Sequence, residues 1–132
     1  LNEADVAVCS RYKKGVNVVN WPLFRILLSY GASFYVKVIT GMKVHDPTAG
    51  FICYRRKVLE AIDLDRIRFI GYAFQIEMKY RAYLKGFKIE EVSIIFTDRI
   101  HGKSKMNSKI IREAIFGVIT MKLRSSFLGK SF

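Results

Sequence analysis

The segment from Leu23 to Thr40 constrains the fold of this chain more than any other stretch, because it predicts one long and nearly all-apolar helix. Pro22 stands at its start, where the missing backbone N–H costs nothing, and Gly41 follows its end. The few polar residues recur every four positions and so form a single stripe along the helix. They are Arg25, Ser29, Ser33 and Lys37. Such a helix belongs in a protein core or at a membrane interface.

The polar stripe allows two interpretations. Arg25 and Ser29 lie one turn apart, and an arginine beside a hydroxyl on an apolar helix can form a pocket for a single phosphate of a lipid carrier. A buried helix with a narrow hydrated edge accounts for the pattern nearly as well. We expect no membrane-spanning segment, because no stretch reaches the ~20 apolar residues that a bilayer requires.

The charge balance indicates an anionic partner. The 132 residues include 23 Lys and Arg against 11 Asp and Glu, a formal net charge of +12. This excess suits nucleic acid, an anionic membrane surface or phosphorylated substrates, and does not choose among them. Apolar residues make up 51% of the chain, which is enough for a core and argues against disorder. The length corresponds to one domain or to part of a larger one.

Two features that often signal a metal site are interpreted otherwise here. Cys9 and Cys53 have no Cys or His neighbours at ligand spacing, which argues against zinc. Asp63 and Asp65 have the D-x-D spacing that holds divalent cations in many nucleotide-sugar enzymes. They follow a predicted helix end rather than a buried strand, so we interpret both as solvated carboxylates. No metal ligand is predicted in this chain.

Both strands and helices are predicted along the chain, and we interpret them as parts of an α/β fold. A buried strand from Asp5 to Cys9 is followed by Arg11, at the position where open α/β sheets bind ligands. Arg11 is therefore a candidate phosphate contact, and a plain surface arginine is an equally good interpretation. Glu77 lies near the start of a predicted helix and is either a buried, paired carboxylate or a solvated one. The other predicted elements are a strand at 51–54, a short helix at 58–62, a helix at 71–85, strand residues within 88–96 and an amphipathic helix at about 108–124.

A basic loop, residues 98–106, precedes the last helix. Arginine and lysine suit phosphate oxygens, and Gly102 lets the backbone turn and approach a ligand closely. Taken alone, such a loop often does no more than keep a protein soluble. The helix after it has an apolar middle and basic flanks. It fits an interfacial helix, and it fits equally well a helix that packs against a missing part of the protein.

Six motifs in this order make the chain resemble a known family, the polyprenol (dolichol) phosphate mannosyltransferases. The motifs are Ser10 to Tyr12, Asn20 to Pro22 with Arg25 and Ser29, Asp46 to Phe51, Tyr72 to Met78, Gly86 to Val92, and Arg99 with Gly102 to Met106. The resemblance implies family 2 and the GT-A type. Residues 1–132 would then be the acceptor-side, C-terminal part of one Rossmann-like GT-A domain, with a mixed sheet and flanking helices. The nucleotide-binding half would be missing.

The resemblance also implies site residues. The positions that match the acceptor-phosphate motifs are Arg11, Arg25 and Ser29. The positions that match the donor-diphosphate loop are Arg99, Lys103 and Lys105. Two carboxylates, Asp46 and Glu77, match positions near the acceptor side and are candidate catalytic residues whose roles are not fixed.

The implied activity is an inverting transfer of a hexose, usually mannose from GDP-mannose, onto the phosphate of a membrane polyprenol. Mg²⁺ or Mn²⁺ is expected in the full-length enzyme, with ligands upstream of residue 1, so this fragment alone should bind no metal and be inactive. The implied partners are the nucleotide-sugar donor, the polyprenol phosphate and an anionic membrane on the cytoplasmic side. A homo-oligomer or a separate anchoring subunit stays open.

Two alternatives remain at this point. A related family 2 enzyme could use UDP-glucose or another sugar nucleotide. A non-enzymatic basic domain could bind a membrane or RNA. RNA fits less well, because the aromatic residues lie in apolar helices and strands, without an RNP-like or helix-turn-helix pattern. Nucleic acid is therefore not a predicted partner.

Overall fold

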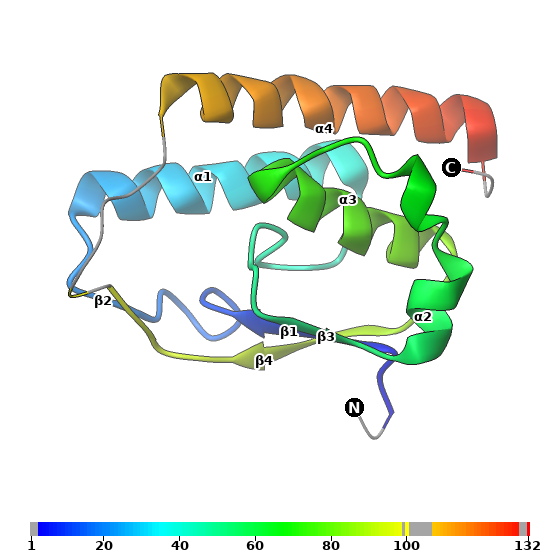
Figure 1. Cartoon of the computed structure of the whole chain (residues 1–132). Coiled ribbons are helices and arrows are strands. Elements are labelled where there is room, and N and C mark those ends of the chain that lie inside the picture. The colour runs from blue at the N-terminus through cyan, green and yellow to red at the C-terminus, as the bar shows by residue number, and fades with distance from the viewer. Residues whose placement is uncertain (1–2, 99, 101–106, 130–131) are drawn as a thin grey trace.

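The computed structural model describes residues 3–98, 100, 107–129 and 132. A small sheet forms one layer, and the three long helices lie on one side of it with α4 outermost (Figure 1). The predicted α/β class, with a mixed sheet and flanking helices, is confirmed. The GT-A assignment stays a prediction.

Strand β1 (Val6–Ser10) is the centre of the three-stranded sheet. It pairs antiparallel with β3 (Ile52–Tyr54) and parallel with β4 (Ile89–Ser93). Its residues alternate between buried and half-buried, as expected for a strand covered by helices on one face. A second sheet pairs the two-residue strands β2 (Val18–Val19) and β5 (Phe96–Thr97) in parallel. The carboxyl end of β1 points towards this second sheet (Figure 1).

Helix α1 (Leu23–Thr40) begins after Pro22 and ends at Gly41, as predicted. Gly41 has a φ of 75°, in the left-handed region that glycine adopts without strain, and its N–H donates to the Lys37 carbonyl. The interpretation as a buried helix with a hydrated edge is wrong. Ser33 is buried against the protein, whereas much of the apolar surface is exposed. The large exposed residues are Leu23, Phe24, Leu27, Tyr30, Phe34 and Val38.

The length and composition of α1 bear on the expectation that no segment spans a membrane. By these two criteria the helix could cross a membrane, although core helices of soluble proteins pass the same test. No other helix in the described part of the chain meets the criteria. Only 17% of α1 is buried, so it is not an ordinary core helix. Its exposed apolar face needs a covering that the described residues do not supply.

Helix α2 (Arg56–Ala61) and the 3₁₀ helix η1 (Leu64–Arg66) connect β3 to α3. Cations at the start of α2 oppose its dipole, and one of them has an acidic neighbour. That neighbour is Asp5, which lies 2.6 Å from the Lys57 ammonium. The hydrogen bond from Lys57 lowers the pKa of Asp5. Asp63 and Asp65 are exposed after the end of α2, as predicted.

Helix α3 (Gly71–Leu84) is enclosed on every side from residue 76 to residue 82. Helix α4 (Ser108–Leu128) extends a turn beyond the predicted end, and Asn107 caps it by accepting from the Ile110 N–H at 2.9 Å. Both α1 and α3 pack against α4. The core between them contains buried residues of all three helices.

Gly117 sets how closely α4 approaches the loop before α3. A Cβ at this position would lie 2.9 Å from the Phe69 ring, closer than side chains normally pack. We expect Gly117→Ala to lower the free energy of unfolding by about 1–3 kcal/mol through overpacking, despite the higher helix propensity of alanine. Urea denaturation measures this. The matched control is Gly31→Ala in α1, where a Cβ meets nothing within 4 Å and the propensity gain should dominate. Equal gains in both variants would refute the Phe69 contact.

Candidate functional site

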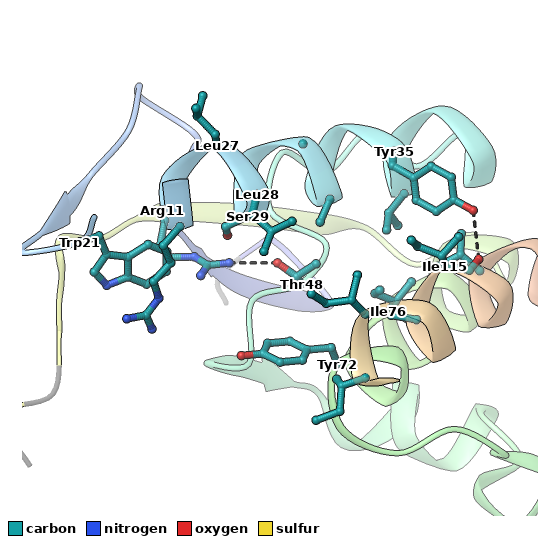
Figure 2. A pocket seen from close by; sticks show the side chains of 18 residues that line it. Arg11, Trp21, Leu27, Leu28, Ser29, Tyr35, Thr48, Tyr72, Ile76 and Ile115 are labelled. Atoms are coloured by element: carbon teal, nitrogen blue, oxygen red, sulfur yellow. Dashed lines mark hydrogen bonds between the residues drawn. The ribbon is translucent and has the colours of Figure 1, made fainter. Parts of the chain in front are cut away.

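A cavity of about 400 Å³ lies between α1, α3 and α4 and opens beside the carboxyl end of β1 (Figure 2). One end of the cavity is polar and carries two guanidinium groups. The side chains at that end are Arg11, Trp21, Arg25, Ser29, Thr48 and Tyr72. The remainder is lined by aliphatic residues of the three helices. The cavity therefore combines a cationic head site with an apolar channel.

Arg11 follows β1 directly, and Asp46 fixes its side chain. The Arg11 Nε donates to Asp46 Oδ2 and the Nη2 donates to Oδ1, both at 2.7 Å, while the backbone N–H of Arg11 donates to Oδ2 at 3.0 Å. Arg11 Nη2 also donates to the Thr48 hydroxyl at 2.9 Å (Figure 2). Burial alone would lower the pKa of Arg11, but the hydrogen bonds and charge of Asp46 raise it overall. The guanidinium is thus permanently charged and held in one direction.

Arg25 projects from the first turn of α1 towards the same end of the cavity. Its guanidinium carbon lies 4.0 Å from the centre of the Trp21 ring, and the Arg11 guanidinium lies 5.5 Å from that ring. Arg25 Nη1 also donates to Asp98 at 2.9 Å. One indole therefore contacts two cations, and cation–π attraction reduces the cost of placing them together.

Ser29 lies one turn beyond Arg25 and accepts a 2.6 Å hydrogen bond from the Tyr12 hydroxyl. Burial raises the pKa of Tyr12, which keeps this hydroxyl protonated as a donor. Because Ser29 accepts from Tyr12, its own proton remains available to an acceptor in the cavity. The site can thus offer a hydroxyl and two guanidinium groups to one anion.

The far end of the cavity is formed where α1 meets α4. The Tyr35 hydroxyl donates to the Ile115 carbonyl at 3.0 Å and joins the two helices (Figure 2). Between this contact and Arg11 the lining is apolar. An amphipathic ligand with an anionic head and an apolar tail matches this arrangement.

The sequence of the chain is similar to those of known proteins. No family model matches the chain. Over 121 residues the chain is 47% identical to polyprenol monophosphomannose synthase from Mycolicibacterium smegmatis. The aligned residues cover 92% of this chain and 46% of that protein. It is 40% identical over 126 residues to undecaprenyl-phosphate mannosyltransferase from Micrococcus luteus, covering 96% and 52%. It is 36% identical over 114 residues to dolichol-phosphate mannosyltransferase from Pyrococcus furiosus, covering 85% and 31%.

The chain is a homologue of polyprenol-phosphate mannosyltransferases. The resemblance drawn from the six motifs is therefore confirmed. The chain spans about half the length of the first two relatives, 46% and 52%, and less of the third. Its assignment to the C-terminal half of a domain stays a prediction.

The structure brings the three predicted acceptor-phosphate residues of this homologue to one cavity. Arg11, Arg25 and Ser29 all line it, although they come from two elements. Their role in binding phosphate stays a prediction. The donor-loop residues Arg99, Lys103 and Lys105 lie outside the described residues.

The two candidate catalytic carboxylates do not line the cavity. Asp46 is fully buried behind Arg11, and both its oxygens accept hydrogen bonds from Arg11. Glu77 is also fully buried. Its Oε1 accepts from Arg81, and its Oε2 accepts from the backbone N–H groups of Arg68 and Phe69. These contacts give both carboxylates a structural role, and their catalytic role stays a prediction.

Sequence reasoning missed two buried charges next to the site. Glu91 in β4 accepts from the backbone N–H groups of His45 and Asp46 and contacts the His45 ring at 2.7 Å. Lys79 in α3 donates to carbonyl groups of the loop that carries Asp46. The sequence held one signal for Lys79, the charges at 77, 79 and 81. Residues 77 and 81 share one face of a helix and residue 79 lies on the opposite face, so the three charges cannot all be on one solvated face.

Proposed function

We propose that this chain is the acceptor-binding part of a glycosyltransferase that moves mannose from GDP-mannose onto the phosphate of a membrane polyprenol, with inversion. The observation that carries this proposal is the cavity, which has two guanidinium groups and a hydroxyl at one end and an apolar channel at the other. The names of the homologues supply the sugar and the class of acceptor.

The chemistry explains why cations rather than a base lie at the head of the cavity. The second pKa of a phosphate monoester is about 6, so the acceptor is largely dianionic at neutral pH and already nucleophilic. The enzyme must hold this dianion against a second anionic group, the donor diphosphate, while that diphosphate leaves. Fixed cations supply both the positioning and the charge stabilisation. Arg11, with its fork fixed by Asp46, is suited to the acceptor phosphate.

The donor and its metal belong, in this proposal, to the rest of the enzyme. Mg²⁺ or Mn²⁺ would neutralise charge on the donor diphosphate. In the described residues no three His, Cys, Asp or Glu side chains come together as ligands, so the residues present do not fit a metal site. We propose that the metal ligands belong to the rest of the enzyme, and no step is assigned to a metal here.

The exposed apolar faces of α1 and α4 support attachment to a membrane surface. Phe24 and Phe34 in α1 are 75% and 63% exposed, and Phe127 in α4 is 87% exposed. Exposed apolar surface on two packed helices, with a net charge of +12, suits an anionic leaflet, which we place on the cytoplasmic side. The polyprenol tail would then reach the cavity without crossing water.

The full-length protein tests this proposal directly. With GDP-mannose and polyprenol phosphate in anionic liposomes we expect a mannosyl-phosphoryl polyprenol, detected by mass spectrometry. Unphosphorylated polyprenol should give no product, because the cations have no anion to bind. A donor panel that includes UDP-glucose separates this activity from that of a related enzyme. Folded, membrane-bound protein that transfers no sugar from any donor, or binds single-stranded RNA tightly instead, would overturn the proposal.

A further inference from the structure

Lys79 is a fully buried lysine whose ammonium group contacts three backbone carbonyl groups in the described part of the chain. Its Nζ lies 2.8 Å from the Pro47 carbonyl, 2.6 Å from the Ala49 carbonyl and 3.1 Å from the Gln75 carbonyl. Three acceptors around one nitrogen require three donors. An ammonium has three N–H groups, whereas a neutral amine has two and would turn its lone pair towards a carbonyl oxygen. The geometry therefore fits the protonated form.

Two of these carbonyl groups belong to the turn formed by residues 46–50. That turn is closed by the Ala49 N–H, which donates to the Asp46 carbonyl at 3.2 Å. It carries Asp46 and Thr48, the two side chains that hold the Arg11 guanidinium. Lys79 thus ties the turn to α3 from behind.

The other end of the turn is fixed from a different element. Glu91 in β4 accepts from the backbone N–H of Asp46 at 3.0 Å. A buried anion and a buried cation therefore hold the two ends of the same turn. That turn carries Asp46, which bonds the Arg11 guanidinium.

We propose that Lys79 is a positioning residue of the acceptor site: its protonated side chain fixes the 46–50 turn and so sets the direction in which Arg11 meets the acceptor phosphate. The proposal rests on the proposed function for the identity of the ligand. It goes further than the proposed function in one respect. Lys79 does not contact the ligand, and yet the proton on its side chain becomes a condition for tight binding of the acceptor.

The proton on Lys79 is lost near neutral pH. Burial lowers the pKa of Lys79 to about 7. The charged groups around it are Asp46 and Glu91, which raise that pKa, and Arg11, which lowers it, while His45 contacts Glu91. Below pH 7 all three carbonyl groups have a donor, and above it one loses its donor. Acceptor binding should therefore weaken above about pH 7. The acceptor becomes more dianionic above about pH 6, which acts in the opposite direction.

The test measures kcat and the KM for polyprenol phosphate of the full-length enzyme between about pH 6 and about pH 9. We expect Lys79→Met to raise this KM about tenfold or more at pH 6.5, the loss expected for charged hydrogen bonds, and to remove the rise of KM above pH 7. Lys79→Arg keeps the charge at every pH, so it should restore part of the affinity and also flatten the profile. An unchanged KM and pH profile in Lys79→Met would overturn the positioning role.

A destabilised control separates positioning from a general loss of packing. Met121 is fully buried in a core cluster whose buried members include no residue of the 46–50 turn, so Met121→Ala should lower the melting temperature and leave the pH profile unchanged. If Met121→Ala reproduces the profile of Lys79→Met, the positioning role is wrong.

A second measurement does not depend on activity. Hydrogen exchange of the peptide covering residues 46–51 should be faster in Lys79→Met than in the wild type and unchanged in Met121→Ala, at equal pH. If the wild type transfers no mannose, the proposed function fails and this comparison still tests the turn. Unchanged exchange in Lys79→Met would overturn the proposal.

Discussion

Replacing Arg11 with alanine is expected to lower mannose transfer to polyprenol phosphate by at least about 100-fold in the full-length enzyme. Removing one fixed donor from a charge-stabilising site typically costs ~2.7 kcal/mol or more in barrier height, which corresponds to that factor. Arg11 supplies a charge as well as donors, and Asp46 holds it in one direction. Initial rates at several acceptor concentrations measure the effect. Arg25→Ala should also reduce transfer strongly, since Arg25 lines the same end of the cavity.

The controls for this experiment follow from the contacts of each arginine. Arg11→Ala leaves the fully buried Asp46 without its cation, so part of the loss could come from destabilisation. Arg11→Lys keeps a cation beside Asp46 but loses the planar fork, and it should fold and still transfer poorly. Arg56→Ala is the matched control. Arg56 is 91% exposed and pairs only with Glu60 in the described structure, so transfer should stay normal. Robust transfer by both Arg11→Ala and Arg25→Ala would refute the site.

Local signals in the sequence were sufficient to predict most helices and strands. Helix α1 began and ended as predicted because proline and glycine act on the backbone of their immediate neighbours. The end of α4 was placed about one turn too early, because Ser125, Ser126 and Phe127 have weaker helix propensity, whereas the helix continues to Leu128 and is followed by Gly129. A glycine follows the last residue of both helices, so short-range backbone chemistry is a signal for both ends.

The orientation of α1 could not be predicted from periodicity. The pattern showed a polar stripe, but a stripe indicates two faces and not which of them meets the protein. The structure turns Ser29 inward because Tyr12, adjacent to β1, bonds it. That contact joins residues 17 positions apart and depends on where the strand ends. The apolar face is left exposed, which is unusual for a water-soluble domain and is consistent with a membrane surface.

Only part of the candidate site could be predicted from the sequence, because some of its contacts join residues that are far apart in the chain. Arg11 and Arg25 were selected by motif, and the structure places them on one cavity. Lys79 was missed because a charge inside an enclosed stretch of helix has no periodic signal, and Glu91 was missed because it occupies the buried position in the middle of β4. Most of their contacts are with backbone groups at least 30 positions away, and only the folded chain brings these together.

Replacing Glu77 with alanine is expected to cause the largest loss of stability among single substitutions in α3. Glu77 and Arg81 form a buried ion pair at 2.8 Å, with side chains 0% and 1% exposed. Removing one partner of such a pair typically costs about 3–5 kcal/mol, because the other charge stays buried without compensation. Two backbone N–H groups, of Arg68 and Phe69, would also lose their acceptor. Chemical denaturation of the full-length protein measures the change.

Two further variants identify the cause of that loss and test the catalytic interpretation of Glu77. Glu60→Ala breaks the same i, i+4 spacing in an exposed pair and should change stability by less than about 1 kcal/mol. Glu77→Gln keeps the size and an acceptor oxygen but removes the charge. If the carboxylate is structural, transfer per folded molecule should be unchanged, since Glu77 does not line the cavity. A well-folded Glu77→Gln enzyme that has lost transfer would instead support the catalytic role. A loss of less than about 1 kcal/mol in Glu77→Ala would contradict the buried pair, because an uncompensated guanidinium cannot stay in that core at so small a cost.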